Sequence, residues 1–205
     1  MIAAILPAAG QSLRMGRPKL ILPVDGATVI ARVVRALREG GADLVVVVSP
    51  PSHEPFTPTL TDEAAAAGAE VIAPMTQPPN MRASIEHAIQ YLDTLVLEPK
   101  HVRLAPADSP GISSRLVAGL LEATRTSPRC IVIPVVGDRR GHPIVIPWSL
   151  ARTIPALPAG VGVNALVAKH AERVLEYACD DPAAIADLDT PEDYERLRDL
   201  EQGVS

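Results

Sequence analysis

Aromatic side chains are scarce in this sequence, which has one Trp, one Phe and three Tyr among 205 residues. We therefore expect an aliphatic core, and we do not expect stacking of bases on aromatic rings to dominate ligand binding. The two cysteines, Cys130 and Cys179, lack the close, paired spacing of a disulfide framework or a zinc site. Both are expected to be reduced, as is usual inside cells.

Long apolar runs and an excess of basic charge are also missing. No stretch approaches the roughly 20 apolar residues that a membrane span requires. The apolar start, residues 1–9, is too short for the core of a signal peptide and has no basic residue before it. We therefore expect a cytoplasmic protein with no membrane contact. The net charge of −5 argues against a nucleic-acid partner, which normally requires a basic face.

Aliphatic residues are abundant instead, and they fall into short segments of alternating type. Runs of β-branched and apolar residues predict strands over Ile2–Leu6, Leu44–Val48, Val71–Ala73, Val102–Ala105, Cys130–Val135, Pro143–Pro147 and Arg173–Tyr177. Helical spacing predicts helices over Val29–Glu39, Thr59–Ala67, Met81–Leu97, Arg115–Arg125, Asn164–His170 and Pro191–Leu200.

Alternating strands and helices indicate an α/β fold built from βαβ units with a mostly parallel sheet. The continuous run Leu44–Val48 is typical of a strand that is buried on both faces. Residues 1–205 contain neither an internal repeat nor a low-complexity linker, so we expect a single domain. Helix ends are indicated by Gly40-Gly41, by Asn80, by Ser113 or Ser114, and by Thr190.

The strongest motif follows the first strand and reads Leu-Pro-Ala-Ala-Gly-Gln-Ser-Leu-Arg-Met-Gly-Arg-Pro-Lys over residues 6–19. Small residues at Ala8, Ala9 and Gly10 let the backbone approach a ligand, and their N–H groups can form an anion nest. Arg14 and Lys19 supply positive charge for a polyphosphate. The string is neither G-x-G-x-x-G nor a P-loop. The alternative is an ordinary turn with two solvated basic residues.

The whole string resembles the signature of GT-A-like nucleotidyltransferases, above all the molybdenum cofactor cytidylyl- and guanylyltransferases. The resemblance implies a three-layer α/β/α fold with a mostly parallel, Rossmann-like mixed sheet. It also implies that Pro7, Ala8, Ala9, Gly10, Arg14 and Lys19 bind a nucleoside triphosphate. The Ala-Ala-Gly form of the turn is usual in the cytidylyltransferase branch, so CTP is expected in preference to GTP.

Three further anchors resemble the same family. Ser84, in a segment similar to Gly-Met-x-x-Ser-Leu/Ile, is implied to contact the base, although Asn80 replaces the usual Gly. Asp108 matches the metal-binding Asp of Gly-Asp-Met-Pro, with Ala107 and Ser109 in place of Gly and Met. Asp189, in Asp-Leu-Asp-Thr-Pro-Glu-Asp, is the second carboxylate that the resemblance implies for Mg²⁺. The alternatives are an unremarkable helical Ser84 and a turn-forming Asp108.

Sequence motifs identify the residues that would bind the acceptor less clearly than those that would bind the nucleotide. Gly141-His142-Pro143 resembles a Gly-His-Pro segment of the family, so His142 is a candidate acceptor contact, with a structural role as the alternative. Relatives often carry an Arg where this chain has Val163, which leaves the neighbouring Asn164 as the polar candidate.

Together these residues imply a Mg²⁺-dependent nucleotidyltransferase that moves CMP from CTP to a phosphorylated small acceptor such as molybdopterin and releases pyrophosphate. Arg14, Lys19 and Asp108 are the expected catalytic residues, and Asp108 and Asp189 the expected metal ligands. One alternative is a sugar- or polyol-phosphate nucleotidyltransferase. Another is a non-catalytic nucleotide-binding relative, which the departures at Asn80, Ala107, Ser109 and Val163 would favour.

Overall fold

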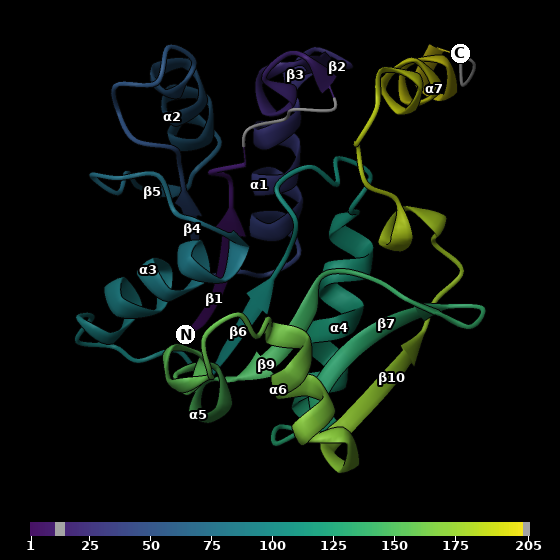
Figure 1. Ribbon diagram of the computed structural model, residues 1–205. Coiled ribbons are helices and arrows are strands. Elements are labelled where there is room, and N and C mark those ends of the chain that lie inside the picture. Colours follow the sequence, from purple (N-terminus) through teal and green to yellow (C-terminus); the bar gives the residue numbers. More distant parts are fainter. Residues whose placement is uncertain (11–14, 203–205) are drawn as a thin grey trace.

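The computed structural model describes residues 1–10 and 15–202, and its centre is one mixed β-sheet with helices packed on both sides (Figure 1). The sheet has eight strands, which are β1 (Ile2–Pro7), β4 (Leu44–Val48), β5 (Glu70–Ile72), β6 (His101–Leu104), β7 (Ile131–Val136), β8 (Arg139–Arg140), β9 (Ile144–Pro147) and β10 (Val174–Ala178).

Strand order across the sheet is β10-β7-β9-β6-β1-β4-β5, and β8 pairs with β7 at the side of this path. The pairs β6–β1, β1–β4, β4–β5 and β7–β10 are parallel, whereas β9 runs antiparallel to both of its neighbours. This arrangement confirms the predicted mostly parallel, mixed sheet. It also places the carboxyl ends of β1, β4, β5 and β6 at one edge, where ligands bind in open α/β folds.

Two helical layers cover the sheet. The helices are α1 (Val29–Glu39), α2 (Thr57–Ala66), α3 (Met81–Asp93), α4 (Ser114–Thr126), α5 (Trp148–Ala151), α6 (Val163–Lys169) and α7 (Pro191–Gln202). Alternate residues of β1 face opposite layers: Ala4 and Leu6 pack with α1, α2, α4 and α7, and Ala3 and Ile5 pack with α3, α5 and α6. The predicted three-layer α/β/α architecture is therefore confirmed, with an aliphatic core on each side of the sheet.

Most predicted helix ends are confirmed by their hydrogen bonds. The Asn80 side chain accepts from Ala83 N–H at the start of α3, and Ser113, rather than Ser114, accepts from Leu116 N–H at the start of α4. At α7, Thr190 and Asp193 form a reciprocal capping box, in which Thr190 Oγ donates to the Asp193 carboxylate at 2.9 Å. That hydrogen bond lowers the pKa of Asp193 below its ordinary value.

Two local predictions needed correction. Helix α3 was expected to reach Leu97 but ends at Asp93, because Thr94 turns back to bond Tyr91 C=O through its hydroxyl at 2.7 Å. The apolar residues that suggested a longer helix, Val96 and Leu97, are exposed. A small hairpin of β2 (Pro23–Val24) and β3 (Ala27–Thr28) was not predicted. Its turn is Asp25-Gly26, both with positive φ, which is a common hairpin signal.

No helix within residues 1–10 and 15–202 is both long enough and apolar enough to cross a membrane.

Candidate active site

The turn after β1 is where the sequence places its phosphate cradle. Pro7, Ala9 and Gly10 line a cavity of about 590 Å³ at the carboxyl edge of the sheet. Ala8 does not line it: its N–H donates to Val48 C=O at 2.8 Å and so extends the β1–β4 ladder. The expectation that all three N–H groups face a ligand therefore has to be corrected for Ala8. Arg14 lies outside the described residues.

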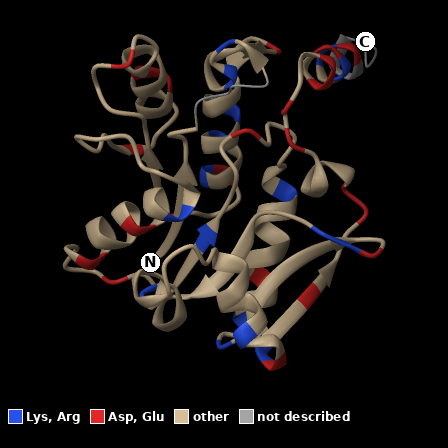
Figure 2. Cartoon of the chain, in the orientation of Figure 1, with Lys and Arg blue, Asp and Glu red and all other residues tan. Residues whose placement is uncertain are grey.

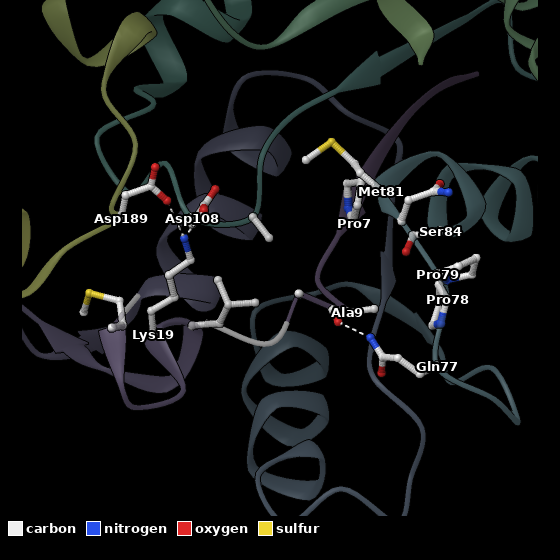
Figure 3. A pocket seen from close by; sticks show the side chains of 15 residues that line it. Pro7, Ala9, Lys19, Gln77, Pro78, Pro79, Met81, Ser84, Asp108 and Asp189 are labelled. Carbon is white, nitrogen blue, oxygen red and sulfur yellow. Dashed lines mark hydrogen bonds and ion pairs between the residues drawn. The ribbon is translucent and has the colours of Figure 1, made fainter. Parts of the chain in front are cut away.

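Four other segments complete the cavity (Figure 3). One wall is the segment from Gln77 to Ser84, which connects β5 to α3 and continues into its first turn. The loop after β6 contributes Ala107 and Asp108, and the stretch before α7 contributes Asp189. Lys19, the first residue of a short 3-10 helix (Lys19–Ile21), enters between these acidic residues.

Backbone and side-chain hydrogen bonds hold the two acidic segments together. Leu188 N–H donates to Asp108 C=O at 2.9 Å, and Ser109 Oγ donates to Asp187 Oδ1 at 2.6 Å. Figure 2 shows the acidic stretch before α7 meeting the loop after β6 above the sheet. Among the residues drawn in colour there, Lys and Arg are spread over many elements. The fold thus brings the loop with Asp108 and the stretch with Asp189 together beside the cavity.

Lys19 joins the two predicted metal ligands. Its ammonium forms an ion pair with Asp108, a second with Asp189 at 3.1 Å, and a hydrogen bond to Leu188 C=O at 2.8 Å. Burial alone lowers the pKa of Lys19, but hydrogen bonds and charge from Asp108 and Asp189 outweigh it and raise the pKa overall. Lys19 is therefore protonated at neutral pH, and it brings Asp108 and Asp189 to one point.

Two carboxylates that meet at one point are suitable ligands for a divalent cation. The described residues contain no group of three or more His, Cys, Asp or Glu that could hold a metal by themselves. Mg²⁺ is commonly held by only one or two carboxylates, with substrate phosphates and water as its other ligands. Asp108 and Asp189 fit a metal that arrives together with a triphosphate.

Ser84 lies on the first turn of α3, lines the cavity and is 2% exposed. Asn80, which replaces a Gly of the family segment, caps this helix and also lines the cavity. An Asn at position 80 in place of Gly therefore stabilises the start of α3 by capping it.

The two candidate acceptor residues lie outside this cavity lining. His142 is half-buried before β9, and its backbone N–H donates to Ala184 C=O at 2.7 Å. Burial lowers the pKa of His142, while the charges of Asp187 and Asp108 and a hydrogen bond with the Leu104 backbone act in the opposite direction. His142 is therefore neutral at neutral pH and sits beside the acidic segments. Asn164 is exposed on α6.

Sequence reasoning missed two polar residues on the α3 side. Gln77 lines the cavity and donates through Nε2 to Ala9 C=O in the phosphate turn. Arg82, the second residue of α3, donates to the carbonyls of Leu157, Pro158 and Val161. Their partners are backbone groups far away in sequence, so no spacing of residue types marks either contact. The only local signal is a lone amide within the Pro-rich loop 74–79.

The chain is similar to several known proteins and solved structures. A nicotine blue oxidoreductase from Paenarthrobacter nicotinovorans is 26% identical over 218 residues and covers 96% of each chain. A molybdenum cofactor guanylyltransferase from Rhizobium meliloti is 28% identical over 203 residues, covering 93% of this chain and 87% of the relative. The fold matches that of a nucleotidyl transferase from Methanothermobacter thermautotroptrophicus, with TM-score 0.80, 22% identity and coverage of 100% and 99%. The family model described as the MobA-like NTP transferase domain matches residues 4–174, and the chain belongs to that family.

Proposed function

We propose that this protein is a Mg²⁺-dependent nucleotidyltransferase that transfers CMP from CTP to a phosphorylated small molecule and releases pyrophosphate. The observation that carries the proposal is the meeting of Lys19, Asp108 and Asp189 in a cavity whose other wall is the Ala9–Gly10 turn. Anion-binding and cation-binding groups thus face the same space, as a metal-bound triphosphate requires.

The triphosphate would lie with its phosphates between the turn and Lys19. The N–H groups of Ala9 and Gly10 would contact phosphate oxygens, and Lys19 would turn from the carboxylates toward the β- and γ-phosphates. Arg14 is proposed to support the same phosphates. Ser84, buried in the opposite wall, would contact the base. The choice of CTP over GTP rests on Ala9, the second residue of the Ala-Ala-Gly turn.

In the proposed reaction, an oxygen of the acceptor phosphate attacks the α-phosphorus. A new P–O bond forms as the bond between the α-phosphorus and the bridging oxygen breaks, and pyrophosphate leaves with that electron pair. The attacking oxygen is already anionic, so no general base is needed. The protein contributes position and charge, as in phosphoryl transfer generally. Asp108 and Asp189 would hold Mg²⁺, which supplies charge neutralisation at the phosphates.

Molybdopterin is the acceptor that we favour, with His142 and Asn164 as candidate contacts. A sugar phosphate or a polyol phosphate would use the same nucleotide site. Pyrophosphate release distinguishes these acceptors when each nucleoside triphosphate is tested with each one in the presence of Mg²⁺. We expect release with CTP to exceed that with GTP. A clear preference for GTP would contradict only the base assignment, whereas no release with any pair would contradict the transferase itself.

A second candidate follows from the full-length relative named an oxidoreductase. Hydride transfer generally needs a nicotinamide or flavin cofactor. Thermal unfolding with Mg²⁺-CTP and, separately, with NADH or NADPH distinguishes the two. A saturating ligand at about 100 times its dissociation constant stabilises a protein by about 2.7 kcal/mol. We expect CTP to give this shift; a shift with the dinucleotide alone would favour the oxidoreductase.

A further inference from the structure

Gln77 reaches from one wall of the cavity to the other. It belongs to the loop between β5 and α3, yet its side-chain amide donates to Ala9 C=O in the turn after β1, 68 residues away. Both residues line the cavity, and Figure 3 shows the hydrogen bond between them. The side chain is half-buried, which reduces competition from water for this bond.

This hydrogen bond fixes the direction of the peptide between Ala9 and Gly10. In a trans peptide the C=O and the following N–H point in opposite directions. With Ala9 C=O held toward Gln77, Gly10 N–H must point away from it. In the view of Figure 3, Ala9 lies between Gln77 and Lys19, and Gly10 lines the same cavity as Lys19, Asp108 and Asp189.

Gly10 itself shows why this orientation concerns a ligand. Gly10 does not have the positive φ that favours glycine. A Cβ placed on Gly10 meets no described atom within 4 Å, so packing in this part of the chain does not demand glycine either. The missing side chain leaves open space beside this peptide, and Gly10 lines the cavity. Because Ala8 N–H is bonded to Val48, the N–H groups left to bind an anion in residues 8–10 are those of Ala9 and Gly10.

We infer that Gln77 is a positioning residue that aims Gly10 N–H at a phosphate of the bound nucleotide. The inference rests on the proposed triphosphate site and adds a residue that sets its affinity. Gln77 does not touch the phosphates; it holds the peptide that does. Without its amide donor, the peptide is free to rotate and the N–H loses its direction before binding.

Two substitutions test this role, Gln77→Ala and Gln77→Glu. The Glu variant keeps the shape but cannot donate to a carbonyl when ionised. Thr76→Ala, an exposed neighbour in the same loop, is the matched control. Calorimetry would measure the Kd of each protein for Mg²⁺-CTP and for cytidine, which has no phosphate. Loss of one well-aimed hydrogen bond to a charged group predicts a rise of about tenfold or more in the Kd for CTP.

We expect both Gln77 variants to bind cytidine as the unmodified protein does, with the loss confined to CTP. Turnover should show a raised KM for CTP and little change in kcat. An equal loss for cytidine and CTP would mean that Gln77 merely holds the loop, and would overturn the inference. So would unchanged CTP binding in both variants. If the unmodified protein binds no triphosphate, the proposed function itself fails. A loss of CTP binding that Thr76→Ala shares with the Gln77 variants would instead reflect damage to the loop and would overturn the inference.

Discussion

Replacing Arg82 by Ala tests how the cavity wall is joined to the loop before α6. Arg82 lies on α3, next to Met81 of the cavity lining, and its side chain is 16% exposed. Its guanidinium donates to Leu157 C=O at 2.8 Å, Pro158 C=O at 2.6 Å and Val161 C=O at 2.9 Å. Its Nε donates to Glu86 at 2.6 Å. One side chain therefore holds three carbonyls of an irregular loop.

The size of the effect follows from these contacts. A hydrogen bond with a charged partner contributes about 1.5–3 kcal/mol when its loss leaves a group unsatisfied. The three loop carbonyls lie near the surface and recover water in the variant, so only part of the sum is lost. The i,i+4 pair with Glu86 adds only about 0.2–0.5 kcal/mol. We expect Arg82→Ala to lower the free energy of unfolding by about 2–3 kcal/mol, which is roughly 4–12 °C in Tm for a chain of this length.

Urea unfolding followed by circular dichroism measures the free energy, and limited proteolysis reports on residues 157–161. Arg82→Lys should recover less than half of the loss, because an ammonium cannot serve three carbonyls as a planar fork does. Arg125→Ala is the control, since Arg125 is an exposed helical arginine that contacts only Glu122 among the described residues. Its effect should stay within about 0.5 kcal/mol. If Arg82→Ala costs no more than this control and leaves the loop resistant to protease, the loop does not depend on Arg82.

Three further predictions concern other sites. Asp108→Asn should keep the fold and bind CTP within a few-fold of the unmodified protein, yet lower kcat by at least about 100-fold; near-normal turnover would show that Asp108 is only a turn residue. Arg103→Met should not destabilise the protein and should raise its free energy of unfolding by about 1–3 kcal/mol. Arg103 is fully buried, its Nε and Nη1 have no partner among the described residues, and burial lowers its pKa to about 10; a loss in urea unfolding comparable to that of Arg103→Ala would contradict this. Asn164→Ala should raise the KM for the acceptor and leave that for CTP unchanged, and equal acceptor kinetics would remove Asn164 from the site.

Much of the fold was predictable because its signals are local. The buried run Leu44–Val48 and the helix Val29–Glu39 match the structure at both ends. The end of α3 was missed because Val96 and Leu97 read as apolar positions of a helix, although both are exposed. Hydrophobic periodicity cannot tell a buried apolar residue from one left at the surface.

The residues of the candidate site also differ in whether a local sequence motif marks them. Lys19, Asp108 and Asp189 each stand in a recognisable motif, and the topology brings the three together across about 170 residues of chain. Gln77 and Arg82 bind backbone carbonyls, which every residue has, so nothing in the sequence identifies their partners. The sequence also gives no sign that Arg103 is buried. Arg103 stands between Val102 and Leu104 in a strand, and an arginine that faces solvent would fit the same pattern.

Three of the four departures from the family pattern have structural roles that preserve the site. Asn80 caps α3 with its side chain, which a Gly cannot do. Ser109 donates to Asp187 and so helps hold the stretch that carries Asp189 beside Asp108. Ala107 is buried in the core and also lines the cavity. None of these changes removes a charge from the cavity, so they do not favour a protein that has lost catalysis.

Val163 is different. It packs against the core on the α3 side, and its side chain has no group that can bind an anion. The substitutions therefore separate: those at or beside the cavity keep its geometry, whereas Val163, the first residue of α6, lacks the charge that the family resemblance implies there. Under the proposed function, a change of acceptor accounts for this pattern better than a loss of activity.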